Sequence, residues 1–209
     1  YFLISIWGAG RKEYSATKYV VYTLFGSAFM LAGILSLYFA TGSLSMVDIT
    51  TKGLGMVQSV MRPALIFFLI LIAFAVKLPV FPLHTWLPDA HTDAPTAASV
   101  MLAGVLIKMG GYGMIRLVSF FPDVARQYAL ILVVLAIIGV LYGAAVTMRQ
   151  TDFKRMIAYS SISHMGYVLL GIFALGKVSL VGASLQMVHH GLVTGLLFAM
   201  VGLVMHNAH

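Results

Sequence analysis

Two lysines stand where a membrane helix should be wholly apolar. Lys77 follows the uninterrupted run Ala64–Val76 of apolar and small residues, and Lys108 lies twelve residues into the apolar segment that starts at Thr96. At about 1.5 Å per residue, both fall near the middle of a bilayer, where a lysine costs about 3 kcal/mol. Amines so deep are typical of groups that move protons or cations. The structural alternatives are a proline kink with Lys77 reaching outward, and a permanent tie between Lys108 and a carboxylate.

Small residues surround Lys108. Gly104 and Gly111 lie on its face of the helix, four residues before it and three after. Small side chains let another helix approach closely, so we expect Lys108 to point into protein. The predicted membrane spans contain no Asp or Glu. We therefore expect the partner of Lys108 to be water or a group outside this chain.

Prolines interrupt the helix that carries Lys77. The stretch FAVKLPVFPLHTWLPDAH, residues Phe74–His91, contains Pro79, Pro82 and Pro88, each of which removes a backbone donor. Carbonyl groups freed at membrane depth are tolerated only where protein or water lines them, and transporters use broken helices to expose them to ions. The sequence thus predicts a break at Lys77-Leu78-Pro79.

Histidines occupy the middle of two further apolar segments. His164 and His190 each belong to a polar stripe on one helix face. The stripes are Ser160–His164–Tyr167 and Gln186–His190–Thr194. Such histidines either move protons or are hydrogen-bonded core residues. The neighbouring His189 is turned by about 100° towards leucines, which favours a packing role.

The four groups Lys77, Lys108, His164 and His190 share one depth. A row of polar groups at one depth indicates a path within the membrane plane rather than across it. Histidine titrates near neutrality and burial lowers the pKa of lysines, so such groups can exchange protons. The sequence predicts proton or cation translocation along this row. His84 and His91, near the end of the broken segment, either relay protons or face water.

The composition sets the class of protein. Hydrophobic residues make up 61% of the chain and charged residues 9%, whereas about a quarter of a typical soluble chain is charged. The thirteen Lys and Arg residues are scattered, which argues against nucleic acid as a partner. Cysteine, a nucleotide-binding glycine loop and an HExxH motif are all absent from the sequence. We therefore expect no metal or cofactor site in this chain, and any electrons must travel through other subunits.

Apolar segments predict an all-α, polytopic membrane protein with about six full transmembrane helices and the end of another. A span needs about 20 residues. The predicted helices are Tyr1–Trp7, Tyr19–Ala40, Pro63–Leu87 (interrupted), Thr96–Ser119, Gln127–Thr147, Arg155–Leu175 and Leu180–Met205. Gly53–Met61 is a candidate short surface helix. Since YFLISIW reads as the end of a helix already under way, we expect an internal piece of a longer protein.

Three segments carry a family resemblance. They are KLPVFPLHTWLPDAHTDAPTAASVMLAGVLIKMGGYGMIRL, QTDFKRMIAYSSISHMGYVLLGI and QMVHHGLVTGLLFAMVG. They resemble the antiporter-like subunit M (subunit 4) family of respiratory complex I, and the resemblance covers essentially the whole chain. It implies an antiporter-like fold of two inverted repeats. Residues 1–209 would form a single membrane domain, with 1–119 ending the first repeat and 120–209 starting the second.

The resemblance also implies roles. Lys77 matches the central pumping lysine, Lys108 the connecting lysine, and His164 and His190 the histidines that continue the axis. The glutamate that pairs with the first lysine would lie upstream of Tyr1. Two positions depart from the family pattern, Asp93 in place of the frequent glutamate and His189 in place of asparagine.

The expected function is that of a non-redox, proton-translocating subunit of a bacterial NADH:quinone oxidoreductase. Its partners would be neighbouring antiporter-like subunits and the lipid of the inner (plasma) membrane. NAD, FMN, iron–sulfur clusters and quinone would bind to other subunits. The alternatives are an Mrp-type cation/proton antiporter or membrane-bound hydrogenase subunit, and a structural scaffold without transport. A heptahelical receptor matches the helix count but leaves the deep lysines unexplained.

Overall fold

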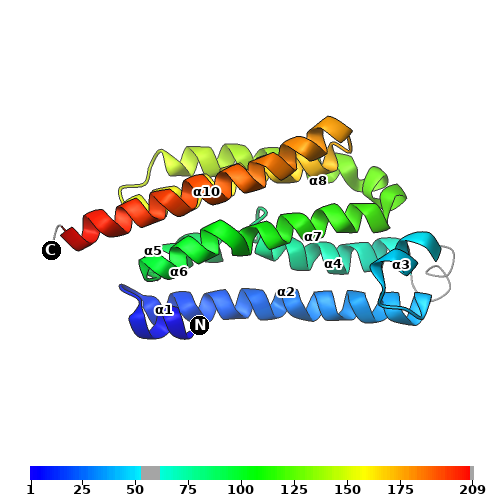
Figure 1. The fold of residues 1–209 in the computed structure, drawn as a ribbon, viewed down its shortest axis with the longest axis horizontal. Coiled ribbons are helices and arrows are strands. Elements are labelled where there is room, and N and C mark those ends of the chain that lie inside the picture. Colours follow the sequence, from blue (N-terminus) through cyan, green and yellow to red (C-terminus); the bar gives the residue numbers. More distant parts are fainter. Residues whose placement is uncertain (53–61, 208–209) are drawn as a thin grey trace.

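Long helices run side by side along the molecule (Figure 1). The computed structural model describes residues 1–52 and 62–207, so the candidate surface helix Gly53–Met61 lies outside the described residues. In chain order the elements are α1 (Phe2–Trp7), α2 (Lys12–Thr41), α3 (Met46–Lys52), α4 (Pro63–Lys77), α5 (Trp86–Asp93), α6 (Thr96–Met101), the π-helical turn η2 (Leu102–Leu106), α7 (Ile107–Phe120), α8 (Pro122–Thr147), α9 (Phe153–Phe173) and α10 (Lys177–Asn207).

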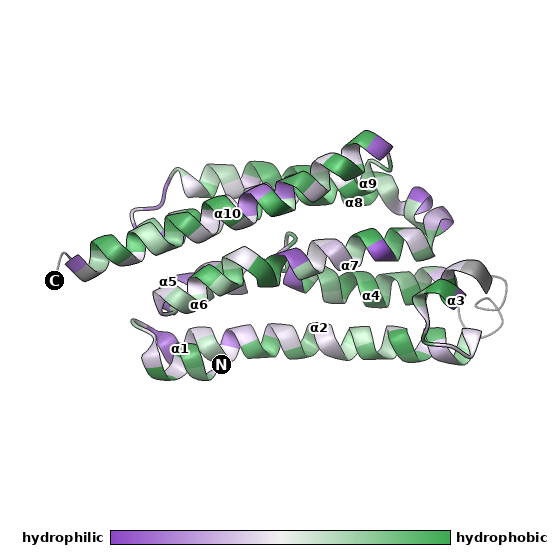
Figure 2. Cartoon of the chain, in the orientation of Figure 1, coloured by the Kyte–Doolittle hydropathy of each residue, from purple (hydrophilic) through white to green (hydrophobic). Residues whose placement is uncertain are grey.

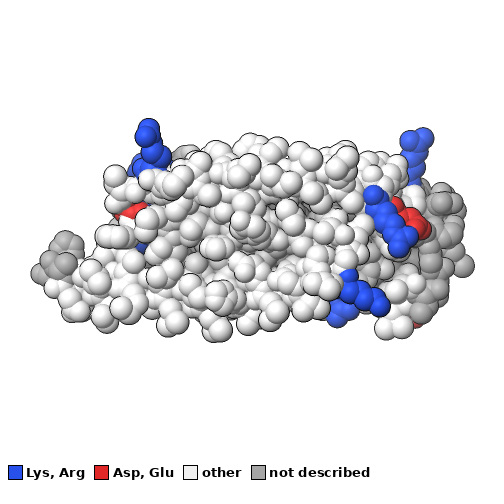
Figure 3. Space-filling view, turned by 90° about the horizontal axis from the view of Figure 1, so that it is seen from above, with Lys and Arg blue, Asp and Glu red and all other residues white. Residues whose placement is uncertain are grey.

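The predicted membrane spans are confirmed. Within the described residues, five helices are long and apolar enough to cross a membrane: α2, the continuous α6–η2–α7 helix, α8, α9 and α10. The interrupted sixth consists of α4 and α5, and α1 is the short end of another. On the face that Figure 3 shows, charged side chains gather towards the two ends of the molecule and leave an uncharged band between them.

Several helices start earlier than their apolar stretches predict. Helix α2 begins at Lys12 rather than Tyr19, and α8 begins at Pro122 rather than Gln127. Polar residues can form the first turns of a membrane helix where it leaves the lipid, and proline suits a first turn because its missing N–H needs no partner there. Helix α9 starts after Asp152, whose Oδ1 accepts a hydrogen bond from the Arg155 backbone N–H at 2.8 Å.

The break in the fourth helix falls where the prolines predict it. Helix α4 ends at Lys77, and Val80 N–H bonds to Ala75 O, one residue further back than in an α-helix. The carbonyl of Val76 accepts instead from the indole N–H of Trp86 at 2.8 Å in a buried position. Protein therefore lines the break, as a freed carbonyl at this depth requires.

Three layers of helices hold the break in place (Figure 1). Helix α4 packs between α2 and α7, α8 and α9 pack on each other, and α10 lies across α9, α6 and η2. Contact between α7 and α4 depends on Gly110, because a Cβ there would lie 2.7 Å from the backbone N of Leu78 and 2.9 Å from the carbonyl oxygen of Phe74. The division into repeats at residues 119 and 120 stays a prediction.

Helix α5 ties the first half of the chain to the second near one end of the molecule. Its Asp89 accepts from Lys18 of α2 at 2.7 Å and lies 3.8 Å from Arg155 of α9. Asp93 accepts a hydrogen bond from the hydroxyl of Ser15 in α2. The short second part of the broken helix is thus fixed from both sides.

Close contact between α8 and α9 gives a first testable prediction. A Cβ on Gly143 would lie 2.7 Å from the backbone N of Ser163, whereas a Cβ on Gly139, one turn earlier, would meet nothing within 4 Å. We expect Gly143→Ala to lower the free energy of unfolding by about 1–3 kcal/mol through overpacking. Gly139→Ala should leave it unchanged or raise it by up to about 1 kcal/mol.

These variants are compared by titrating the purified subunit in detergent micelles with SDS. Equal unfolding curves for Gly143→Ala and Gly139→Ala would contradict the packing of α8 on α9.

Capping of the break by Trp86 gives a second prediction. Trp86→Phe keeps an aromatic ring in the core but leaves the buried Val76 carbonyl without its donor, and we expect a loss of about 1–3 kcal/mol in unfolding free energy. Trp7, which is 64% exposed, is the matched control. Thermal denaturation in micelles should show a lower midpoint for Trp86→Phe and no change for Trp7→Phe. Identical midpoints would argue against the capping bond.

Candidate functional site

Lys108 meets His190 at the centre of the molecule. Lys108 lies at the midpoint of the 25-residue span Thr96–Phe120, and its Nζ is 2.7 Å from Nδ1 of His190. A charged amine can only donate, so Nδ1 accepts and the proton of a neutral His190 ring lies on Nε2. Ala103 O also accepts from the amine. The expectation that the partner of Lys108 is water or lies outside the chain was therefore wrong, because a neutral imidazole and a carbonyl meet the need without a carboxylate.

Local structure directs Lys108 towards α10. The π-helical turn Leu102–Leu106 directly precedes α7, and π turns are frequent at functional sites. A Cβ on Gly191 of α10 would lie 3.0 Å from Gly104 O and 3.5 Å from Lys108 Cε. The prediction that small residues let another helix approach Lys108 is confirmed, with α10 as that helix.

His164 extends this contact. Its ring centroid lies 5.4 Å from that of His190, with the ring planes at 61°, and its Nδ1 is 3.1 Å from Nε2 of Gln186. His190 is 2% exposed, whereas His164 is exposed on the surface of the chain. The Lys108–His190–His164 string (these three side chains in order) thus runs from the interior to the surface. Figure 2 shows the hydrophilic stretches halfway along α10 and at the start of α7.

Thr194 completes the surroundings of the buried ring. Its hydroxyl donates to the carbonyl of His190, one turn earlier, and lies 3.2 Å from His190 Nδ1. Thr194 is 3% exposed. His190 Nε2 is buried and has no hydrogen-bond partner among the described residues. The ring therefore holds one engaged nitrogen and one open nitrogen, which is the state a group needs to take up a proton on one side and release it on the other.

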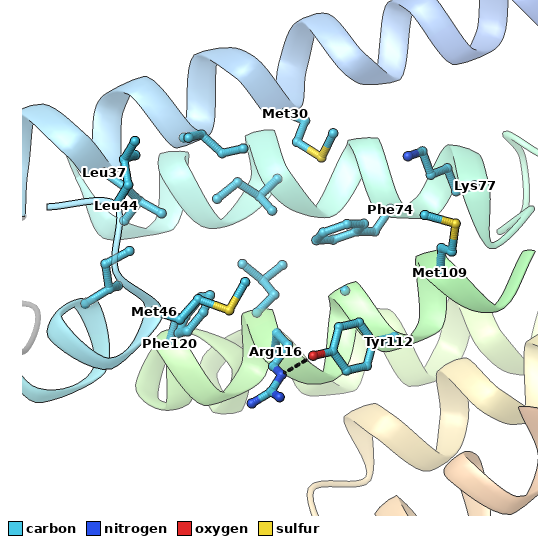
Figure 4. Close-up of a pocket in the computed structure, with 15 residues that line it drawn as sticks. Met30, Leu37, Leu44, Met46, Phe74, Lys77, Met109, Tyr112, Arg116 and Phe120 are labelled. Atoms are coloured by element: carbon cyan, nitrogen blue, oxygen red, sulfur yellow. Dashed lines mark hydrogen bonds between the residues drawn. The ribbon is translucent and has the colours of Figure 1, made fainter. Parts of the chain in front are cut away.

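Lys77 lies apart from this string. It lines a cavity of about 430 Å³ whose other walls are mainly apolar side chains of α2, α4 and α7. In Figure 4 its amine points towards the α2 side, while Arg116 at the other end donates to Tyr112 Oη at 2.9 Å. Among the described residues, Lys77 has no hydrogen bond or ion pair that would join it to Lys108. Exchange of protons between the two lysines stays a prediction.

The cavities of the two lysines share walls. Met109 and Tyr112 line the cavity of Lys77 and also a second one that contains Lys108 and Gly191. These two residues of α7 therefore border both cavities.

The remaining histidines behave differently from one another. His84 is 3% exposed, and its ring stacks on Phe81 at 5.5 Å and meets the edge of Tyr142 at 5.0 Å. His91 is completely buried. The alternative that these two histidines face water is wrong in this fold, and the relay role of His84 stays a prediction. His189 is exposed, as are Leu185 and Leu192, and its packing role stays a prediction.

Sequence reasoning missed two contributors. Trp86 caps the break, although a tryptophan ten residues after a freed carbonyl carries no signal of that bond. Phe198 stacks on His91, and only its spacing of eight residues from His190 indicated that it shares that face of α10.

Comparisons with known proteins show the family to which the chain belongs. Residues 1–209 match the family described as NADH:quinone oxidoreductase/Mrp antiporter, transmembrane. Chain 4 2 of the NAD(P)H-quinone oxidoreductase of Thermosynechococcus vestitus is 47% identical over the whole chain, which covers 39% of that relative. NADH-quinone oxidoreductase subunit M of Rickettsia prowazekii is 41% identical, again over the whole chain and 42% of the relative. The chain thus spans about two fifths of the length of these curated relatives.

Solved structures share the fold of this chain. A chain of respiratory complex I from Thermus thermophilus with bound NADH superposes with a TM-score of 0.88 at 30% identity, covering 97% of this chain and 43% of that one. A chain of the Mrp complex from Dietzia sp. DQ12-45-1b gives a TM-score of 0.80 at 25% identity, covering 91% and 35%. The chain therefore belongs to the transmembrane family shared by NADH:quinone oxidoreductases and Mrp antiporters, and it is similar to the subunit M and chain 4 members of that family.

Proposed function

We propose that this chain forms part of a proton-translocating, non-redox subunit of a bacterial NADH:quinone oxidoreductase. The observation that carries the proposal is the Lys108–His190–His164 string, which places an amine and two imidazoles in sequence within the apolar part of the molecule. Similarity to curated subunits of such oxidoreductases over the whole chain supports it.

Proton transfer along the string requires only that nitrogen atoms gain and lose protons. A proton that leaves Lys108 Nζ for His190 Nδ1 turns the amine neutral and gives His190 an N–H on both nitrogens. The second N–H, on Nε2, can then be released towards His164, with water bridging the space between the rings. Lys77 would supply Lys108 from the neighbouring cavity. No electron moves in these steps, so NAD, FMN, iron–sulfur clusters and quinone would act in partner subunits of the same inner-membrane complex.

A second candidate function is that of an Mrp-type cation/proton antiporter subunit. The similarity to a chain of the Mrp complex favours it, and membrane-bound hydrogenase subunits belong to the same alternative. The neighbouring genes discriminate, because genes for dehydrogenase and quinone-site subunits indicate the oxidoreductase, whereas genes for further antiporter subunits indicate the antiporter. The third alternative, a structural scaffold, predicts that neutral substitutions along the string have no effect on transport.

The central lysines give the decisive test. We expect Lys77→Ala and Lys108→Ala to abolish proton pumping by the complete complex reconstituted into liposomes, because each removes a group that must carry the proton. Acidification of the lumen on addition of NADH and quinone is followed with a pH-sensitive dye. Normal stoichiometry in either assembled variant would refute the proposed path.

Adjacent histidines of α10 provide a matched pair. Gln cannot be protonated, so His190→Gln should lower the rate of proton translocation about tenfold or more, since a positioned proton-transferring group contributes about 10²–10⁴-fold. His189→Gln changes the same residue type one position earlier, on the exposed side, and should leave the rate unchanged. Equal rates for both variants in the dye assay would show that the string carries no protons.

A further inference from the structure

His91 is a buried titratable group to which the string gives no role. It is 0% exposed on α5, and neither ring nitrogen has a hydrogen-bond partner among the described residues. Leaving a buried polar group unpaired costs about 1–3 kcal/mol, and most such groups in native proteins are paired. A buried ring whose two nitrogen atoms are both without a hydrogen-bond partner therefore needs an explanation.

The ring is aligned with the string. It stacks on Phe198 of α10 with a centroid distance of 4.7 Å and ring planes at 10°. His190, Thr194 and Phe198 are spaced by four residues and so lie on one face of α10. At about 1.5 Å per residue, Phe198 is about 12 Å further along the helix than His190. His91 of α5 thus packs against the face of α10 that carries His190, about two turns further along that helix.

Two buried hydroxyl groups lie close to His190 and to His91. Thr194 is halfway from His190 to Phe198 on α10, and its Oγ1 lies 3.2 Å from His190 Nδ1. Ser99 of α6 is 0% exposed and donates to the carbonyl of His91 at 3.1 Å. Buried water molecules need such polar partners, and these hydroxyls could hold a short chain of them.

Lys154 marks the other side of His91. It is the second residue of the span Phe153–Phe173, and its Nζ donates at 2.9 Å to the carbonyl of Ala94, three residues after His91. A neutral imidazole ring carries one N–H and one free nitrogen, and in His91 both of these nitrogens are buried without a partner among the described residues.

We infer that His91 is a proton carrier between the Lys108–His190 pair and the membrane surface at which α9 begins, at Phe153. The free ring nitrogen binds a proton from water on one side, and the other nitrogen releases its proton to water on the opposite side, so no net charge stays on the ring. This inference rests on the proposed function, because it gives the proton path along the membrane plane a connection to one membrane surface.

A packing role is the competing explanation, since His91 also fills space against Phe198. Three substitutions separate the two in the complete complex. His91→Phe keeps a stacked ring without nitrogens, His91→Gln keeps hydrogen bonding without titration, and His91→Glu keeps titration without the ring. Lys108→Ala reports on the proposed function itself, and Phe198→Leu reports on stacking.

Proton pumping is measured in liposomes, and assembly of each variant is checked by native gel electrophoresis. We expect His91→Phe and His91→Gln to lose pumping to the level of Lys108→Ala, with His91→Glu retaining more than His91→Gln and Phe198→Leu retaining most of it. Normal pumping in His91→Phe alongside its loss in Lys108→Ala would overturn the inference and leave the proposed function standing.

Two further outcomes are decisive. Normal pumping in Lys108→Ala would overturn the proposed function and the inference together. Should His91→Phe fail to assemble, the comparison of His91→Gln with His91→Glu decides, and equal pumping in these two would overturn the carrier role.

Discussion

Lipid offers no hydrogen bonds, so every polar group at membrane depth must find its partner within protein or bound water. This constraint explains the surroundings of two polar groups, the Val76 carbonyl and the Lys108 amine. The Val76 carbonyl, released by the prolines, takes the indole N–H of Trp86. The Lys108 amine takes a carbonyl and an imidazole. The second solution differs from the first because one of its acceptors, the imidazole, is itself a titratable group.

The two central lysines meet the constraint differently. Lys108 of α7 donates to His190 of α10, and the two helices approach each other closely at Gly191. Lys77 ends α4 beside a mainly apolar cavity, and Met109 and Tyr112 of α7 line both this cavity and the one that contains Lys108. The amine of Lys108 thus donates to a titratable ring, whereas the amine of Lys77 borders mainly apolar side chains.

Local chemistry in the sequence predicted the elements well, but not which of them meet. Apolar length fixed the spans, and the prolines after Lys77 placed the break at the correct residue. The starts of α2 and α8 were predicted late because polar first turns leave no apolar signal. The partner of Lys108 was missed because contacts between helices 82 residues apart depend on packing at Gly104 and Gly191. Burial of His91 depends on Phe198, more than a hundred residues away in the chain.

The π-helical turn before Lys108 sets the direction of this side chain. A π turn holds one more residue than an α turn, so the residues that follow Leu102–Leu106 are turned by about 100° about the helix axis relative to a helix without it. The bulge thus directs the Lys108 amine to His190 of α10, whereas a regular α-helix would present it to a different neighbour.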